Sequence, residues 1–128
     1  MNELIWLNRE DCLAIHEMMV AQHGGLAGVR DEGMLESALF KPPNLQAYSS
    51  PTLAAMAASY AAGIILNHPF LDGNKRTGFL LAATFLELNG LEFAAAEESV
   101  VEATLALASG KMNQAAYAEW LDMNSKKG

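Results

Sequence analysis

The sequence has one cysteine and little positive charge, and each shortage excludes a class of protein. Cys12 has no second cysteine to pair with, so no intramolecular disulfide can form and we expect a reducing compartment. A formal net charge of −7 leaves no broad basic face, which argues against a nucleic-acid or membrane partner. The first residues lack the basic segment of a signal peptide. We therefore expect a cytoplasmic protein.

Long hydrophobic runs are also missing. The longest apolar stretch, residues 53–66, falls short of the about 20 residues that a transmembrane helix needs, and it is better explained as a buried helix. With 52% hydrophobic and 18% charged residues, the chain has ample material for a core. Its 128 residues suit a single domain over residues 1–128.

Capping residues and helix breakers predict an all-α domain of about six helices with short connections. The first helix should begin at Asn8, whose side chain can cap it, and end at His23 before two glycines. A short helix over residues 34–40 should end at Pro42, with 44–50 irregular. Ser50 and Pro51 together resemble a helix start. That helix should run to about residue 67 and be followed by helices over about 74–88, 97–108 and 113–120, with residues 91–93 extended.

The segment HPFLDGNKRTG, residues 68–78, is the densest polar cluster of the chain and lies between its two most apolar helices. It should form the turn between these helices and the first turn of the second. The first turn of a helix presents unpaired backbone N–H groups and the positive end of the helix dipole, which together attract anions. Gly73 has no Cβ, so an anion can approach its backbone closely.

The charges in this cluster predict a site for a metal-bound polyphosphate. Lys75 and Arg76 oppose the helix dipole, and phosphate groups would compensate for that cost. Asp72 would repel a bare phosphate but can hold Mg²⁺ beside it. His68 can then act as a general base. These are the parts of a phosphoryl or nucleotidyl transferase site.

Simpler explanations exist for each of these residues taken singly. His68 can cap the preceding helix, Asp72 or Asn74 can cap the next one, and Lys75 and Arg76 can be solvated. Only their concentration in one turn favours a functional site.

A second pair of residues offers an alternative metal site. Cys12 and His16 are spaced to face a metal together from one helix, but no third ligand is evident, so core packing is the better interpretation.

The string HPFLDGNKR follows the pattern His-x-Phe-x-(Asp/Glu)-(Gly/Ala)-Asn-(Gly/Lys)-Arg of the Fic/Doc family, and GGLAGVRDEGMLESAL resembles the small death-on-curing (Doc) toxins. The resemblance extends from Leu4 to about Leu121. It implies the all-helical Fic fold with the motif loop between two central helices, Mg²⁺ as cofactor and ATP as substrate. By position, His68 is the catalytic base, Phe70 anchors the loop on the core, and Asp72 is the metal ligand. The resemblance implies that the nucleotide-binding turn consists of Gly73, Asn74, Lys75 and Arg76.

The resemblance also implies a reaction. Doc toxins carry lysine at the Lys75 position and transfer the γ-phosphate of ATP to elongation factor Tu, which arrests translation. Fic enzymes with glycine there transfer AMP, and Pro69 and Gly73 are typical of those members. A Doc-type protein kinase is the leading interpretation. An AMP transferase is the alternative, and a non-catalytic module that binds nucleotide or a partner is the third.

The chain lacks one further motif. Many Fic proteins inhibit themselves with a helix bearing Ser/Thr-x-x-x-Glu-(Gly/Asn), and this string does not occur here. We therefore expect control by a separate antitoxin, bound as a short helix in an apolar groove near the motif loop.

Overall fold

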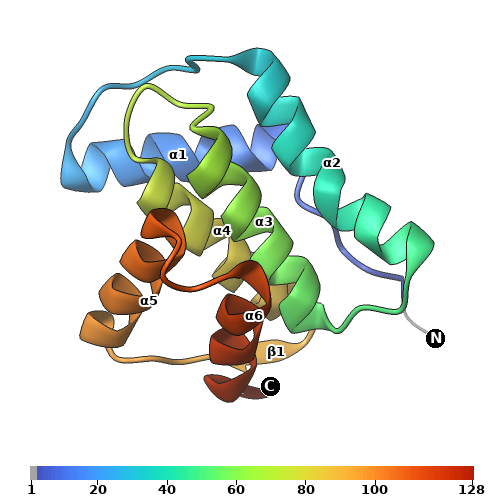
Figure 1. The fold of residues 1–128 in the computed structure, drawn as a ribbon. Coiled ribbons are helices and arrows are strands. Elements are labelled where there is room, and N and C mark those ends of the chain that lie inside the picture. Colours follow the sequence, from blue (N-terminus) through green and yellow to red (C-terminus); the bar gives the residue numbers. More distant parts are fainter. Residues whose placement is uncertain (1–2) are drawn as a thin grey trace.

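The computed structural model describes residues 3–128. Met1 and Asn2, which belong to the N-terminal segment expected to lack a signal peptide, lie outside the described residues. Within this range the chain is mostly helical with one small two-stranded sheet, so the predicted all-α fold is confirmed (Figure 1). The elements are α1 (Arg9–His23), α2 (Glu32–Tyr48), α3 (Leu53–Asn67), α4 (Asn74–Leu88), β1 (Leu91–Phe93), α5 (Glu97–Ser109), α6 (Gln114–Met123) and β2 (Ser125–Lys127).

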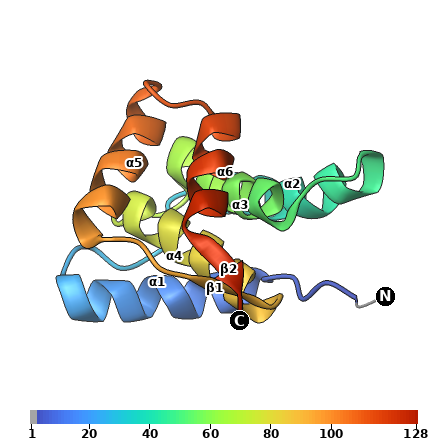
Figure 2. The ribbon, with the colours of Figure 1, turned by 90° about the horizontal axis from the view of Figure 1, so that it is seen from below.

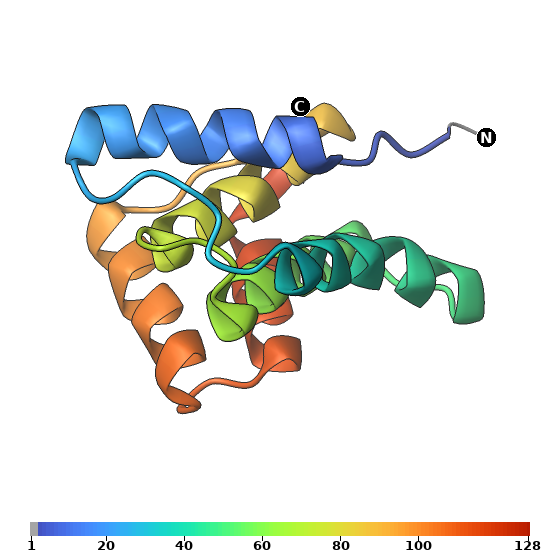
Figure 3. The ribbon, with the colours of Figure 1, turned by 90° about the horizontal axis from the view of Figure 1, so that it is seen from above.

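The centre of the fold is the helix pair α3 and α4. It lies between α1 on one side and α5 with α6 on the other (Figures 2 and 3). Because α3 is apolar on nearly every face, it is buried on nearly every face. Along residues 3–128, no helix has both the length and the hydropathy needed to cross a bilayer.

Two glycines allow the central helices to approach one another closely. A Cβ on Gly63 of α3 would lie only 3.1 Å from the Cα of Ala38 in α2. A Cβ on Gly78 of α4 would lie 3.0 Å from the carbonyl oxygen of Ala61 in α3. Both distances are tighter than ordinary van der Waals contacts. The absence of side chains at these points therefore sets the spacing of α2, α3 and α4, and with it the position of the loop that joins α3 to α4.

Most predicted helix boundaries are confirmed. Asn8 and Asp11 form a capping box at the start of α1, in which each side chain accepts a hydrogen bond from the other residue's N–H (2.9 and 3.0 Å). Asn113 caps α6, accepting from the Ala116 N–H at 2.8 Å. The predicted starts of α4 at Asn74 and of α5 at residue 97 are also observed.

The prediction for α2 is wrong, because this helix continues through both prolines to Tyr48. A proline inside a helix removes a hydrogen bond and costs about 3 kcal/mol. Here Pro42 is buried, and Leu45 packs against the core one turn later. Burial of this apolar face offsets the cost of the prolines, and residues 44–48 are helical instead of irregular.

Three further expectations need correction. The cap of α3 is Thr52, which accepts from the Ala55 N–H at 3.0 Å, so the helix begins two residues beyond the predicted Ser50–Pro51 start. The last helix extends past residue 120 to Met123. The extended segment 91–93 is confirmed as β1, but its antiparallel partner β2, which pairs Phe93 with Ser125, was not predicted because its three residues are polar.

Candidate active site

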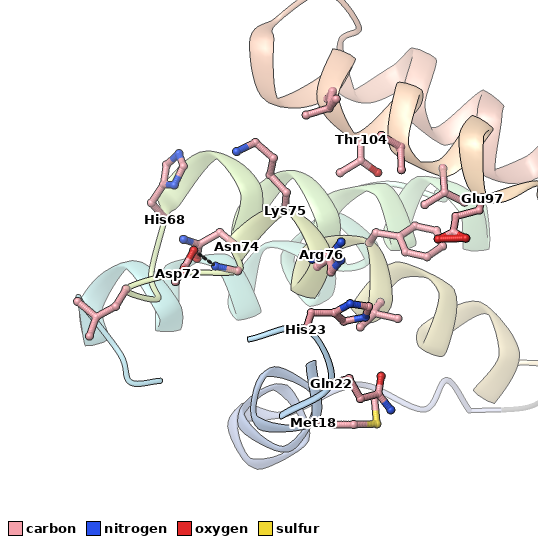
Figure 4. Close-up of a pocket in the computed structure, with 17 residues that line it drawn as sticks. Met18, Gln22, His23, His68, Asp72, Asn74, Lys75, Arg76, Glu97 and Thr104 are labelled. Carbon is pink, nitrogen blue, oxygen red and sulfur yellow. Dashed lines mark hydrogen bonds between the residues drawn. The ribbon is translucent and has the colours of Figure 1, made fainter. Parts of the chain in front are cut away.

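The loop between α3 and α4 places His68 at the end of α3. His68 is the C-cap of that helix, and its N–H donates to the carbonyl oxygen of Ile64 at 3.2 Å. Its φ of 49° and ψ of 55° lie in the left-handed region, and among residues 3–128 it is the only non-glycine residue with a positive φ. Such a conformation costs about 1–2 kcal/mol and must be held by its surroundings. The exposed imidazole projects toward solvent at the edge of a cleft (Figure 4).

The segment 24–31, between α1 and α2, holds this loop by backbone hydrogen bonds. The Pro69 carbonyl accepts from the N–H groups of Arg30 (2.6 Å) and Asp31 (3.1 Å), and the Leu71 N–H donates to the Gly28 carbonyl (3.1 Å). The Arg30 side chain adds two more bonds, to the carbonyl oxygens of Asn67 (3.1 Å) and His68 (2.7 Å). The loop is therefore fastened to a segment about 40 residues earlier in the chain.

Phe70 turns into the core beneath the loop. Its side chain is buried and stacks on the imidazole of His16 in α1, with ring centroids 3.8 Å apart and an interplanar angle of 6°. The same His16 ring donates from Nε2 to the carbonyl oxygen of Asp72 at 2.9 Å. The stacked rings of Phe70 and His16 thus support the loop against the core, and the bond from His16 fixes the peptide group that precedes Gly73.

Asn74 closes the loop on itself. Its side-chain oxygen accepts from the Phe70 N–H, and its amide nitrogen donates to the Phe70 carbonyl, both at 3.0 Å. The side chain is buried by these contacts. The Asn74 side chain therefore supports the loop, and the backbone N–H groups of the first turn of α4 are those available to a ligand.

Gly73, the N-cap of α4, has a backbone conformation that favours glycine and packs closely against α1. Its φ is 77°, and a Cβ there would lie 2.0 Å from Cε of Met19 in α1. The space beside Gly73 is thus occupied by a methionine. The first helical bond of α4 runs from the Thr77 N–H to the Gly73 carbonyl (3.0 Å), so the preceding N–H groups are those that helix geometry leaves for an anion.

Asp72 keeps its carboxylate at the surface while backbone donors orient it. Oδ1 accepts from the Gly73 N–H at 2.9 Å, and Oδ2 accepts from the Leu26 N–H at 3.3 Å. Each oxygen has thereby accepted one bond and retains a lone pair for another partner.

A cleft of about 630 Å³ brings these groups together (Figure 4). Its walls are the end of α1, the first turns of α4 and one face of α5. Lys75 and Arg76 line it beside His68 and Asp72. Among residues 3–128, neither of these cations forms an ion pair with a carboxylate. Both cations therefore face the cleft at the N-terminus of α4, a helix end at which positive charge is unfavourable.

Comparison with known proteins shows which family has this fold and this motif loop. The family model described as the Fic/DOC family matches residues 6–86, which include α1 to α3, the loop and most of α4. The chain belongs to the Fic/DOC family. The recognition made from the HPFLDGNKR string is confirmed.

Two relatives are similar to this Fic/DOC chain over most of its length. The protein named Toxin Doc from Mycolicibacterium smegmatis (strain ATCC 700084 / mc(2)155) is 38% identical over 94 residues, which are 70% of this chain and 68% of that protein. The protein named Protein kinase doc from Escherichia phage P1 is 29% identical over 116 residues, covering 90% of this chain and 91% of that protein. Both likenesses point to the Doc branch of the family.

The donor set of this Fic/DOC cleft suits a hard cation that arrives with its own phosphate ligands. Within the described part of the chain, no three His, Cys, Asp or Glu side chains come together to hold a metal. Asp72 supplies one exposed carboxylate next to the N-terminus of α4. Mg²⁺ is commonly bound by one or two carboxylates together with phosphate oxygens and water, so the residues present fit Mg-ATP.

The alternative metal site at Cys12 is not supported, and its interpretation as core is confirmed. Cys12 and His16 are both buried. Burial raises the pKa of the Cys12 thiol to about 12, which opposes the thiolate that a metal would need.

Three residues that shape the site were missed in the sequence. His16 was interpreted as a core residue in preference to a metal ligand with Cys12, although it binds the Asp72 carbonyl. Arg30 and Met19 were given no role at the loop. These residues lie outside the motif, and no short-range pattern links them to it. A single basic residue in a glycine-rich segment was the only signal for Arg30.

Proposed function

We propose that this chain is a Doc-type toxin that uses Mg-ATP to phosphorylate a hydroxyl group of a translation factor similar to elongation factor Tu. One observation carries the proposal: His68, Asp72, Lys75 and Arg76 line a single cleft at the N-terminus of α4. The name of the phage P1 relative, a protein kinase, supports the same chemistry.

His68 is the base of the proposed reaction. Its exposed imidazole takes the proton from the target hydroxyl while the hydroxyl oxygen attacks the γ-phosphorus. The bond from that phosphorus to the bridging oxygen breaks, and ADP leaves. Lys75 and Arg76 hold the phosphate groups and reduce their charge, and Asp72 binds the Mg²⁺ that accompanies ATP, which further neutralises the phosphates.

The test follows the label from ATP to a purified translation factor. The γ-phosphate label should appear on the target with a mass gain of one phosphate group, and folded His68→Ala should transfer none. Transfer of the α-label with an AMP-sized mass gain would refute the kinase. Absence of any transfer to every candidate target would leave only the non-catalytic binding module.

An AMP transferase is the second candidate, because Pro69 and Gly73 match the AMP-transferring members of the family. The structure weakens the argument from Gly73, since its positive φ and its contact with Met19 favour a glycine whatever nucleotide binds. Lys75 places a long cationic side chain in the cleft at the position where those members have glycine. This difference supports the kinase.

The proposed toxin also requires an antitoxin partner. The relative from M. smegmatis is named a toxin. The cleft wall formed by α1 and α5 exposes three apolar side chains, those of Met18 (47% exposed), Val101 (50%) and Leu105 (51%). An amphipathic helix can bury such a strip.

Co-expression with the adjacent small gene tests for this partner. Its product should co-purify with the chain, and the double change Val101→Glu and Leu105→Glu should abolish capture. Leu88→Glu, which alters an equally exposed leucine outside the cleft, should not. If the neighbouring product neither binds nor neutralises the chain, the toxin–antitoxin proposal fails.

A further inference from the structure

Arg30 makes an unusual set of contacts with the loop that carries His68. Its Nε donates to the His68 carbonyl oxygen at 2.7 Å, and its Nη2 donates to the Asn67 carbonyl oxygen at 3.1 Å. Its backbone N–H also donates to the Pro69 carbonyl oxygen at 2.6 Å. One residue therefore binds three consecutive carbonyl groups.

The two side-chain bonds act on the peptide groups that flank His68. The Asn67 carbonyl belongs to the peptide group before the His68 Cα, and the His68 carbonyl belongs to the one after it. The orientations of these two planes about that Cα are its φ and ψ. The guanidinium is rigid and planar, so a single group that binds both oxygens fixes φ and ψ together.

This matters because His68 adopts the left-handed conformation, with φ of 49° and ψ of 55°. This region is uncommon for any residue other than glycine, and relaxation to a common conformation would redirect the Cβ of His68. The backbone bonds from segment 24–31 hold Pro69 and Leu71, which follow His68. The carbonyl oxygen of the peptide group that precedes His68 is bound by the Arg30 side chain.

We propose that Arg30 is a positioning residue that sets the direction of the His68 imidazole without touching nucleotide. The inference rests on the proposed function. It predicts that the transfer rate and nucleotide affinity respond differently to loss of Arg30, because Arg30 does not line the cleft that contains Lys75 and Arg76. Loss of its side chain should impair transfer and leave nucleotide binding intact.

The experiment compares Arg30→Ala and Arg30→Lys with wild type. At saturating Mg-ATP the transfer rate should fall about 10- to 100-fold in both variants, because lysine cannot bridge two carbonyl groups with fixed geometry. The Mg-ATP dissociation constant should change less than about twofold. Millimolar guanidinium ion should restore part of the rate of Arg30→Ala. The matched control is Arg9→Ala, which removes an arginine paired with Glu32 away from the cleft and should change neither quantity.

A second readout does not depend on activity. Amide hydrogen exchange of the His68 N–H, which is bonded to the Ile64 carbonyl, should accelerate in Arg30→Ala and remain unchanged in Arg9→Ala. If wild type transfers nothing, the proposed function fails, and this exchange still decides the role of Arg30. An unchanged rate and exchange would overturn the inference. A parallel loss of rate and Mg-ATP affinity would also overturn it.

Discussion

At the residue scale, two features of the structure favour the glycine at Gly73. Its φ of 77° favours glycine, and the thioether of Met19 occupies the space that a Cβ would need. Gly73→Ala should therefore lower the free energy of unfolding by about 2–4 kcal/mol, from backbone strain and overpacking combined. Urea denaturation measures this change.

The matched control for Gly73 is Gly110, which is also left-handed, with φ of 83° and ψ of 3°, and has no atom within 4 Å of an added Cβ. Gly110→Ala should lose only the strain of the left-handed conformation, about 1–2 kcal/mol. Introducing Met19→Ala should reduce the cost of Gly73→Ala, because the clashing methyl group is removed. Equal costs at the two glycines would show that packing against α1 is unimportant.

Arg76 is expected to contribute affinity rather than stability. It is exposed, lines the cleft and has no carboxylate partner among residues 3–128. Arg76→Ala should weaken Mg-ATP binding by about 1.5–3 kcal/mol, the range of a charge-assisted hydrogen bond, with little change in melting temperature. Isothermal titration calorimetry in magnesium buffer gives the affinity. Unchanged binding would make Arg76 a solvated helix residue.

The motif residues could be predicted from the sequence because they are close together in it. A nine-residue string placed His68, Asp72 and Arg76 in the turn between two helices and the first turn of the second, and the structure brings them to one cleft. The supports of the loop could not be predicted in this way. His16 and Arg30 lie 56 and 38 residues from their partners, and such contacts depend on how α1 and α2 pack.

At the element scale, the spacing of the central helices depends on glycines in contact. A Cβ on Gly78 would lie 2.7 Å from Cγ1 of Ile65 and 3.0 Å from the carbonyl oxygen of Ala61. Gly78→Ala should force α4 away from α3 and cost about 1–3 kcal/mol. Thermal and urea unfolding would measure the loss.

Gly33 of α2 supplies the opposite case for comparison. It is a helical glycine whose nearest atom to an added Cβ, Oδ1 of Asp31, lies at 3.4 Å. Gly33→Ala should be neutral or gain up to about 1 kcal/mol, since alanine restricts the unfolded chain. Destabilisation by both changes would mean that helix contact at Gly78 is not the cause.

Helix ends with clear capping chemistry could be predicted, whereas the end of α2 and the strand β2 could not. Ser50 and Thr52 are both good caps, and only the folded chain selects Thr52. For α2, local preference favours a stop at Pro42, and burial of that residue against the core overrides it. β2 exists because the chain end returns to β1, which three polar residues do not reveal.

At the scale of the whole molecule, three buried acids make stability depend on alkaline pH. Burial raises the pKa of Cys12, Tyr60 and Tyr117 to about 12 each, above the ordinary values of 9.0 for the thiol and 10.0 for the phenols. Above about pH 9 the unfolded chain loses these protons before the folded chain does. The free energy of unfolding should therefore fall by about 1.4 kcal/mol per pH unit for Cys12 above about pH 9. Each tyrosine should add about the same slope above about pH 10, until about pH 12.

Tyr117→Phe isolates one part of this pH effect. At pH 8 the variant should be less stable than wild type by about 1 kcal/mol, because the contact between the Tyr117 hydroxyl and the Thr104 hydroxyl is lost (3.3 Å). By pH 11 the difference should close or reverse, since the variant has no phenol to ionise at this position. A gap that stays constant with pH would contradict the expected burial of the neutral phenol.

The backbone bonds between segment 24–31 and the motif loop have a consequence for how this sequence can drift over evolutionary time. Main-chain N–H and carbonyl groups are the same in every residue except proline, so the contacts to Pro69 and Leu71 make few demands on side-chain identity. Gly25 and Gly28, with φ above 100°, are the constrained positions. Leu26 and Ala27 are exposed, so substitutions at these two positions should leave the shape of the loop unchanged.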